Sequence, residues 1–351
     1  MPNDPSAFTI GGNDEHGTEP PTPGKRTPVM PYINRSILEN EFNRAAKLRF
    51  LEACLRVGFN VYDVKPETSD PTISARVARI NSRRLTRLVT FGYNAYGSGG
   101  AFNEMSGFVT AFSSRNPYPD TSRAYAEDIT LALERSGLKL NSLQDLDIGV
   151  LGSVNCVSAL IEPGFMTEYS EAARMLDPDF AVTVAEAATR ATCLNLDVRY
   201  VERDDMSAYT TVRPGERGNA VRLLQYLLIS EGFDIAADGV FGGATRNALV
   251  DYQLLSGLDP DGVAGANTFA SLLALNTPSP LKRGDGGASV TLLQRRLLSR
   301  LYPVGADGIF GSETESAVRD FQREHSLPVT GIADAATVSA LLSSPPRPRL
   351  Y

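Results

Sequence analysis

Residues 87–100 read RLVTFGYNAYGSGG, and this stretch indicates the kind of fold that the first half of the chain adopts. Leu88, Val89 and Phe91 form a short apolar run, which gives way to polar, aromatic and glycine residues. Such a pattern is typical of a buried strand that ends at a loop on a working edge of a sheet. Gly92 stands where the strand ends, and it has no side chain to contribute there.

The segments around this strand alternate between strand and helix patterns throughout residues 1–200. Strand patterns cover residues 8–12, 59–65, 88–93, 107–114 and 157–165. Helix patterns cover residues 37–58, 72–84, 123–137, 168–176 and 180–194. The apolar residues of 37–58 favour one side of the helix, and Gly58 is a stop signal. This alternation predicts an α/β fold with a mixed, mainly parallel sheet covered by helices on both faces.

The second half of the chain contains a duplication. Residues 237–253 read ADGVFGGATRNALVDYQ and residues 306–322 read ADGIFGSETESAVRDFQ, at a constant offset of 69 residues. Each copy has the pattern of a helix, a turn, a helix, a turn and a short helix. The duplication therefore predicts two small all-α domains of three helices each. We expect most of the shared residues to be core and turn positions.

The two copies resemble the peptidoglycan-binding repeat domain that is attached to many cell-wall hydrolases. The shared marks are G-x-x-G-x-x-V-x-x-L-Q, D-G-x-F-G-x-x-T, an aromatic-Gln pair and a later G-x-x-x-x-x-T. The resemblance implies one such domain over 213–275 and another over 281–344, with a binding surface near the DGxFG turns. Linkers are expected at 205–212 and 276–280, and a disordered tail at 345–351.

Composition excludes several classes of function. The net charge is −7 and no block of Lys or Arg persists, so nucleic acid is not an expected partner. No stretch of about 18 apolar residues occurs, so we expect no membrane partner. The N-terminus has no signal-peptide pattern. Cys54, Cys156 and Cys193 are scattered in apolar surroundings, which predicts buried thiols.

Four polar junctions in residues 1–204 are candidates for a site, because sites in open sheets form at the carboxyl ends of strands. They are the loop 13–28 with His16, the helix start with Glu39 and Glu41, the FGYNAYG junction at 91–97, and Glu162 after an apolar strand. A carboxylate at the end of a buried strand is costly unless it has a partner or a role.

These junctions carry a resemblance to the zinc-dependent N-acetylmuramoyl-L-alanine amidases of bacterial walls and phages. The similar segments are HGTEPPTPGKRTP (16–28), ENEFNRA (39–45), NAYGSGGAFNEMSGF (94–108) and IEPGFMTEYSEA (161–172). They follow the family's order over about residues 8–195. The resemblance implies an amidase-like domain over 1–204 that cuts the bond between the lactyl group of muramic acid and L-alanine.

The resemblance also implies roles for individual residues. The family's zinc is held by two histidines and one glutamate, and a second glutamate is the general base. His16 matches the first ligand, Glu39 matches the glutamate ligand in preference to Glu41, and Glu162 matches the catalytic glutamate. The second ligand histidine aligns with Gly92. Substrate-binding positions correspond to Asn94, Lys25 and Arg26.

One zinc ligand is therefore missing, and two protein ligands hold zinc poorly. We expect a degraded site with weak or no catalysis, and further departures from the family pattern at Asp14, Glu15 and Glu168 support this. An oxygen ligand could instead be supplied by Tyr93, Asp14 or Glu15, whereas His325 lies in the second repeat. Without the resemblance, His16 is a surface residue and Glu39 a carboxylate favoured by the helix dipole.

Two functions remain open. The first is a peptidoglycan amidase, such as a phage endolysin or a tail-associated lysin. The second is a catalytically silent wall-binding or structural component of a phage tail or contractile injection apparatus, whose proteins would be its partners. In both cases peptidoglycan is the target and two linked binding domains add avidity. We expect synthesis in the cytoplasm and action at the cell wall through phage, virion or injection-apparatus delivery.

Overall fold

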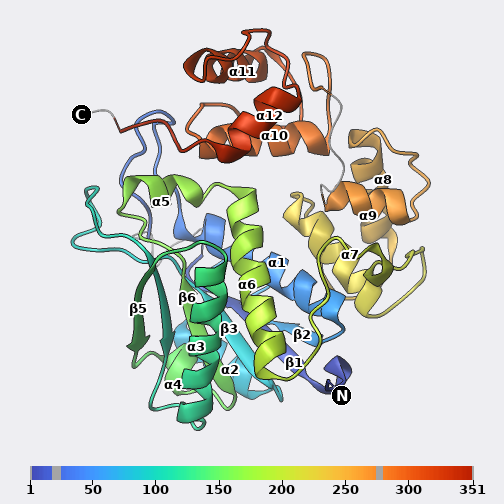
Figure 1. Ribbon diagram of the computed structural model, residues 1–351. Coiled ribbons are helices and arrows are strands. Elements are labelled where there is room, and N and C mark those ends of the chain that lie inside the picture. Colours follow the sequence, from blue (N-terminus) through green and yellow to red (C-terminus); the bar gives the residue numbers. More distant parts are fainter. Residues whose placement is uncertain (1, 18–24, 274–279, 350–351) are drawn as a thin grey trace. The chain divides into compact units, whose positions relative to one another are not determined.

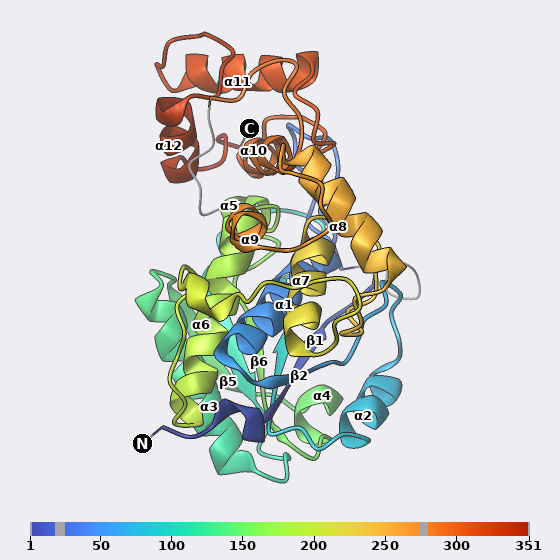
Figure 2. The same cartoon turned by 90° about the vertical axis from the view of Figure 1, so that its right-hand side faces the viewer.

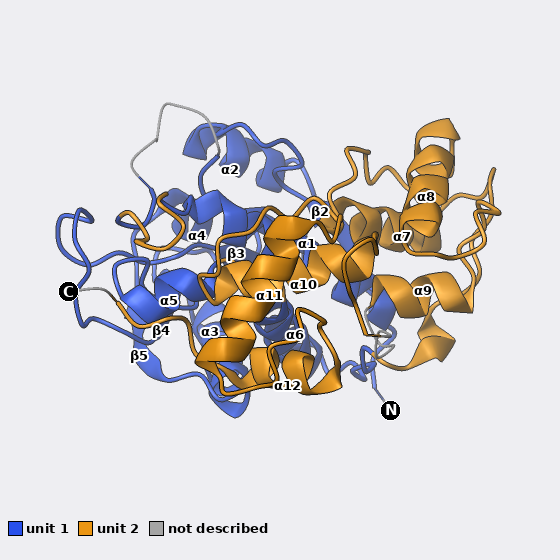
Figure 3. Cartoon of the chain, turned by 90° about the horizontal axis from the view of Figure 1, so that it is seen from above, with its two compact units in different colours: residues 1–28, 36–175, 179–203 blue, residues 29–35, 176–178, 204–351 orange. Residues whose placement is uncertain are grey.

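The computed structural model describes residues 2–17, 25–273 and 280–349. The chain forms two compact units (Figure 3). Unit 1 comprises residues 1–28, 36–175 and 179–203, and unit 2 comprises residues 29–35, 176–178 and 204–351. Among the described residues, no helix combines the length and apolar character needed to cross a bilayer. Of the expected linker 276–280, all but Pro280 lies outside the described residues.

Unit 1 is built on a six-stranded sheet with the order β2-β1-β3-β6-β4-β5 (Figure 1). Its strands are β1 (Thr9–Asp14), β2 (Asn60–Asp63), β3 (Arg87–Phe91), β4 (Phe108–Phe112), β5 (Leu140–Asp145) and β6 (Val157–Glu162). Among the described strand pairs of this sheet, β4 with β6 is antiparallel and the other four are parallel. The predicted mixed, mainly parallel sheet of an α/β fold is confirmed.

Helices cover both faces of this sheet (Figures 1 and 2). The helices are α1 (Glu39–Val57), α2 (Ile73–Asn81), α3 (Pro119–Arg135), α4 (Gly149–Gly152), α5 (Tyr169–Arg174) and α6 (Pro178–Asn195). On one face, Phe50 of α1 packs on Phe91 of β3, and α6 lies against α3 through the hydroxyls of Tyr125 and Thr192. On the other face, Ile80 of α2 packs in a cluster with Leu88.

Helix α1 is buried along most of its length, which differs from the one-sided pattern expected from its sequence. Lys47, Glu52 and Arg56 are buried as well as the apolar side chains. The guanidinium of Arg56 lies 2.6 Å from the carboxylate of Glu186 on α6, so this face is covered by a charged partner. Gly58 ends the helix in the left-handed conformation, with φ at 105°, as its position predicted.

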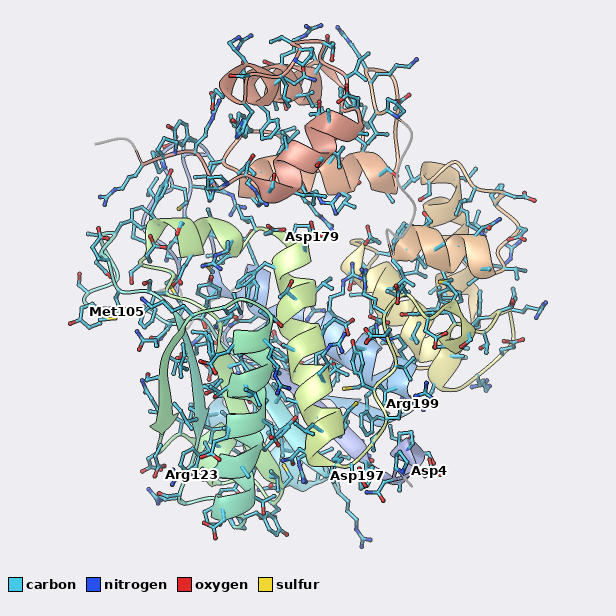
Figure 4. The ribbon with its side chains drawn as sticks, in the orientation of Figure 1. Asp4, Met105, Arg123, Asp179, Asp197 and Arg199 are labelled. Atoms are coloured by element: carbon cyan, nitrogen blue, oxygen red, sulfur yellow. The ribbon has the colours of Figure 1, made fainter. Side chains whose placement is uncertain are left out.

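The N-terminal segment is tied to the end of α6. The backbone N–H of Asn3 donates to the carbonyl of Asp197 at 2.7 Å, and its side chain donates to the carbonyl of Leu196 at 2.8 Å. Asp4 and Asp197 accordingly lie close together in Figure 4. Asp4 caps the short 3₁₀-helix η1 (Pro5–Ala7), which leads into β1.

The three cysteines are free and buried, as predicted. Burial raises the pKa of the Cys156 and Cys193 thiols to about 12. These thiols therefore stay protonated at neutral pH and act as small apolar groups.

Unit 2 contains the two predicted three-helix repeats. The first consists of α7 (Asn219–Ser230), α8 (Gly243–Leu255) and α9 (Ala266–Leu272). The second consists of α10 (Ala288–Ser299), α11 (Ser312–Glu324) and α12 (Ala335–Ser343), and η2 (Met206–Ala208) precedes both. In the second repeat, Val290, Leu297 and Phe321 are completely buried in one apolar core. The shared apolar residues are core positions, as expected.

A buried glutamine fastens each DGxFG turn to the preceding helix. Gln294 donates to the Asp307 carboxylate at 2.8 Å and to the Thr314 hydroxyl at 2.9 Å, and its oxygen accepts from the Gly308 N–H at 2.9 Å. Gln225 makes the same set of bonds in the first repeat. The polar groups of each turn thus find their hydrogen-bond partners within the repeat, so their role is structural.

We expect Gln294→Ala to destabilise the second repeat by about 1–3 kcal/mol, because it leaves the buried N–H of Gly308 without an acceptor. Calorimetric melting of the full chain measures this loss as an earlier transition of one repeat. Arg323→Ala is a suitable control, because that side chain is 63% exposed. Equal melting of the two variants would contradict a structural role for Gln294.

Part of the expected disordered tail is ordered against the second repeat. Residues 344–349 have neither helix nor strand. The Arg347 guanidinium nevertheless lies 2.5 Å from the Glu324 carboxylate and 3.9 Å from the centre of the Tyr302 ring. An ion pair and a cation–π contact together hold this segment in place. The proline-rich sequence of the segment gave no sign of this order.

Candidate functional site

Three neighbouring strands bring their carboxyl ends to one edge of the sheet. Asp14 of β1 pairs with Phe91 of β3, and Phe91 pairs with Ile161 of β6. The ladder of hydrogen bonds continues for one more residue. The Glu15 N–H donates to the carbonyl of Phe91 at 2.8 Å, and the Gly92 N–H donates to the carbonyl of Ile161 at 2.9 Å. One residue beyond the paired positions is therefore a row made of Glu15, Gly92 and Glu162.

The glycine in the middle of this row makes space for its neighbours. A Cβ atom at Gly92 would lie 2.9 Å from Oε2 of Glu15 and 3.4 Å from Cγ of Glu162. Both carboxyl side chains thus lean over the backbone of Gly92. A larger residue at this position would therefore meet these side chains, whereas the backbone of Gly92 is not in the left-handed conformation that requires glycine.

His16 follows the row and has a left-handed backbone conformation, with φ at +58°. Its Nε2 atom lies 3.7 Å from Oε2 of Glu39, and its Nδ1 atom lies 3.7 Å from Oδ2 of Asp70. Burial and the charge of Lys25 lower the pKa of His16 to about 4. The imidazole is therefore neutral at physiological pH, which is the form that binds metals.

Glu39 begins α1 and faces His16. Its Oε1 atom accepts from the Tyr93 N–H at 2.8 Å and from the Asn43 amide at 3.0 Å. Its Oε2 atom is buried and has no hydrogen-bond partner. The side chain is only 2% exposed, so water does not replace the missing partner. An unpartnered carboxylate oxygen this deeply buried is costly unless a cation or a donor binds it.

The arrangement fits a divalent metal ion. Glu15, His16 and Glu39 each offer one ligand atom, and these atoms lie within 4.8 Å of one another. Burial and repulsion between carboxylates raise the pKa of Glu39 to about 7 and that of Glu162 to about 8. A cation at this place would relieve that repulsion and satisfy Glu39.

We expect the metal-free chain to lose stability as the pH rises from 6.5 to 8.5. The folded-state pKa values of Glu39 and Glu162 lie above the unfolded value of about 4.5, so the folded state holds more protons in this range. His16 opposes this change only near pH 6.5, where the unfolded imidazole still binds part of a proton that the folded one has lost, so its effect is the smaller one. The expected loss is roughly 2 kcal/mol.

Calorimetric melting of the full chain in the presence of a chelator, followed at the transition of unit 1, checks this pH dependence. Glu162→Gln should flatten the dependence, because glutamine does not titrate. Stability that rises with pH over the same range would contradict the proximity of these carboxylates.

Two of the three residues considered as substitute oxygen ligands are engaged elsewhere, which corrects the expectation for them. The Asp14 carboxylate lies 2.7 Å from the ammonium of Lys47 and 2.8 Å from that of Lys65, and all three side chains are buried. The Tyr93 hydroxyl donates to the carbonyl of Glu171 at 2.7 Å. Glu15 alone of the three lies against His16 and Glu39.

The departures from the family pattern at Asp14 and Glu168 have structural roles. Asp14 neutralises two buried lysines. Glu168 caps α5, since its carboxylate accepts from the Glu171 N–H at 2.8 Å and from the Ser170 hydroxyl at 2.6 Å. Local contacts thus account for these two departures from the family pattern.

The three positions expected to contact substrate lie near this edge. Lys25 is exposed, its carbonyl accepts from the Glu39 N–H at 3.0 Å, and its charge acts on His16. Arg26 is exposed and forms a bridge with Leu38. Asn94 is half-buried, and its side-chain oxygen accepts from the next N–H at 2.7 Å. His325 stacks on Phe321 within the second repeat.

Asp70 and Glu171 are site-supporting residues that the sequence did not reveal. Asp70 faces Nδ1 of His16 and pairs with Arg76. Glu171 accepts from the N–H groups of Phe165 and Gly107 at 2.7 and 2.8 Å, which holds the loop after β6. Glu171 lies in the first turn of α5 and Asp70 lies in the loop just before α2, so neither follows a strand, where the sequence pointed to a site.

Comparisons with known proteins identify the families that the two parts of the chain match. Residues 15–193, just over half of the chain, match the family model of N-acetylmuramoyl-L-alanine amidases. Residues 217–272 and 286–341 each match a peptidoglycan-binding domain model. The N-acetylmuramoyl-L-alanine amidase CwlL of Bacillus licheniformis is 29% identical over 168 residues, which covers 38% of this chain and 46% of that protein.

Two further similarities are more limited. The zinc D-Ala-D-Ala carboxypeptidase of Streptomyces albus G is 37% identical over 103 residues, covering 27% of this chain and 39% of that protein. The chain thus spans less than half the length of these curated relatives. The solved amidase Ami1 of Mycobacterium smegmatis has a TM-score of 0.47 at 19% identity, over 55% of this chain and 99% of that one.

Proposed function

The chain belongs to the N-acetylmuramoyl-L-alanine amidase family, and from this premise we propose that it binds peptidoglycan and hydrolyses the amide between muramic acid and L-alanine. An amidase domain over 1–204 would act while the domains over 213–275 and 281–344 hold the wall. The observation that carries the proposal is the buried, unpartnered Oε2 atom of Glu39 beside the neutral imidazole of His16. A site that had lost its metal function would not be expected to keep this costly pair.

His16 and Glu39 would hold the metal, zinc being the ion the family uses, and Asp70 would orient the imidazole through Nδ1. When bound, the ion polarises the substrate carbonyl and acidifies a water molecule. Two protein ligands are too few for firm binding, so a further protein ligand is required. Lys25, whose charge acts on Glu39 and Glu162, offsets part of the negative charge of the site.

Glu162 would act as the general base and then as the general acid. Its carboxylate accepts the proton of the attacking water while the new C–O bond forms at the lactyl carbonyl carbon. It then delivers this proton to the nitrogen of L-alanine as the C–N bond breaks. Burial and repulsion from Glu15 raise the pKa of Glu162 to about 8, which lets it carry a proton near neutral pH.

The proposal is tested by incubating purified peptidoglycan with the full chain and one equivalent of zinc, and labelling new amino groups. New amino termini on L-alanine support the proposal, and their loss on adding chelator supports a metal requirement. Amino termini on other residues, or none above the buffer control, would refute it.

A silent wall-binding component is the second candidate, and Gly92 in place of a ligand histidine is the observation that favours it. In this case the chain would serve in a phage tail or contractile injection apparatus. It would sediment with the wall through its repeats and release no L-alanine termini, with or without metal.

A further inference from the structure

Glu15 fills the space that a side chain at position 92 would occupy. Glu15 and Gly92 lie at corresponding positions beyond the paired ends of β1 and β3. The Oε2 atom of Glu15 is 2.9 Å from the place of a Cβ atom at Gly92. A carboxylate thus stands where the side chain of a residue other than glycine would begin.

The same carboxylate belongs to the cluster that fits a metal ion. One oxygen of Glu15 lies within 4.8 Å of the ligand atoms of both His16 and Glu39. The buried Oε2 atom of Glu39, which has no hydrogen-bond partner, faces the same place. This orphaned oxygen is an observation independent of the acidic character of the cluster, and it points to a cation.

We propose that Glu15 is the third protein ligand of the metal, so that the residue after β1 supplies the group that a histidine at position 92, after β3, would otherwise supply. This inference rests on the proposed function, since it concerns the metal of the same site. It makes the site one imidazole and two carboxylates, held by His16, Glu39 and Glu15. The site is rebuilt rather than degraded.

Neighbouring residues explain why Glu15 is the residue that takes this place. Successive side chains of a strand point to opposite faces, so Asp14 and Glu15 point to opposite sides. Asp14 is held on the side of α1 by Lys47. The Asn43 amide donates to the carbonyl of Glu15 at 3.2 Å and also to Glu39, which fixes the two candidate ligands relative to each other.

The ligand set has a consequence for metal preference. Carboxylate oxygens suit harder ions such as Mn²⁺, whereas imidazole nitrogens favour zinc. Replacing one imidazole by a carboxylate should therefore narrow the preference for Zn²⁺ over Mn²⁺. It also makes Gly92 and Glu15 interdependent, because a side chain at 92 collides with the Glu15 carboxylate.

The test is a double-mutant cycle on the full chain with Glu15→Ala, Gly92→His and the combined variant. Binding of Mn²⁺ is read from the loss of the free-ion paramagnetic resonance signal, and binding of Zn²⁺ by calorimetry. Each single change should weaken Zn²⁺ binding at least about tenfold, and the combination should restore it. The ratio of Zn²⁺ to Mn²⁺ affinity should be about tenfold larger in the combined variant than in the native chain.

Controls separate this inference from folding and from the proposed function. Glu15→Gln preserves volume and should weaken binding as well, and Glu134→Ala changes an exposed carboxylate of α3 and should not. Native-like Zn²⁺ binding by Glu15→Ala, or absence of metal binding by the native chain, overturns the inference. Hydrolysis by the native chain alongside unchanged binding in Glu15→Ala leaves the proposed function standing. Metal binding that depends on Glu15, in a native chain that does not hydrolyse peptidoglycan, supports the inference and refutes the proposed function.

Discussion

Glu162→Gln is expected to lower the rate of peptidoglycan hydrolysis by about 10²–10⁴-fold, because it removes the group that accepts and returns the proton. Glu162 ends β6 directly beside Gly92, and its Cγ atom lies 3.4 Å from the place of a Cβ atom there. Burial raises its pKa to about 8, with contributions from Glu15 and Glu39. Glutamine has nearly the same shape but cannot take up a proton.

This loss should leave the other properties of the chain intact. Metal binding should persist, because Glu162 is not among the three residues whose ligand atoms lie together. Sedimentation with the wall should persist too, because the repeats over 217–272 and 286–341 are unchanged. The measurement is the initial rate of release of L-alanine amino termini at saturating metal. A rate within threefold of the native chain would remove Glu162 from the mechanism.

Asp14→Asn is expected to reduce the free energy of unfolding of unit 1 by about 3–5 kcal/mol. The Asp14 carboxylate is completely buried between the ammonium groups of Lys47 and Lys65, at 2.7 and 2.8 Å. Burial alone would raise the pKa of Asp14, but the two ammonium groups outweigh it and hold the pKa below its usual value. An amide would leave both buried ammonium groups without the charge of Asp14, although Lys47 also lies 2.8 Å from the Asp63 carboxylate.

An exposed ion pair provides the matched control. Asp147 pairs with Arg115, and the two side chains are 64% and 70% exposed. Asp147→Asn should cost less than about 1 kcal/mol, since surface pairs contribute little. Urea unfolding followed by circular dichroism measures both losses. Equal effects of the two substitutions would show that the cluster around Asp14 does not stabilise the fold.

The main elements of the fold could be predicted from the sequence because their patterns are local. The strand ending at Phe91 and the duplicated helices have clear apolar periodicity. The prediction missed β5, Leu140–Asp145, because this edge strand is half-exposed and has few apolar residues. It also missed α4, Gly149–Gly152, since four residues are too few to show a helical period.

The site could be predicted only in part, for a physical reason. The resemblance identified His16, Glu39 and Glu162 as candidates, and the structure brings all three to the same edge of the sheet. The neighbours of Gly92 depend on strand order, which places β3 between β1 and β6. No sequence pattern shows that Glu15 lies across from Gly92. The absent histidine, together with the departures at Asp14, Glu15 and Glu168, therefore suggested a degraded site.

The central claim is that this carboxyl edge is a working amide hydrolase site, and isotope incorporation tests it most directly. Peptidoglycan is digested in ¹⁸O-labelled water with the full chain and one equivalent of metal, and the products are separated by mass spectrometry. The account predicts one ¹⁸O atom in the lactyl carboxylate of muramic acid and unlabelled stem peptides that begin with L-alanine. Intact muropeptides, or ¹⁸O at any other bond, would contradict it.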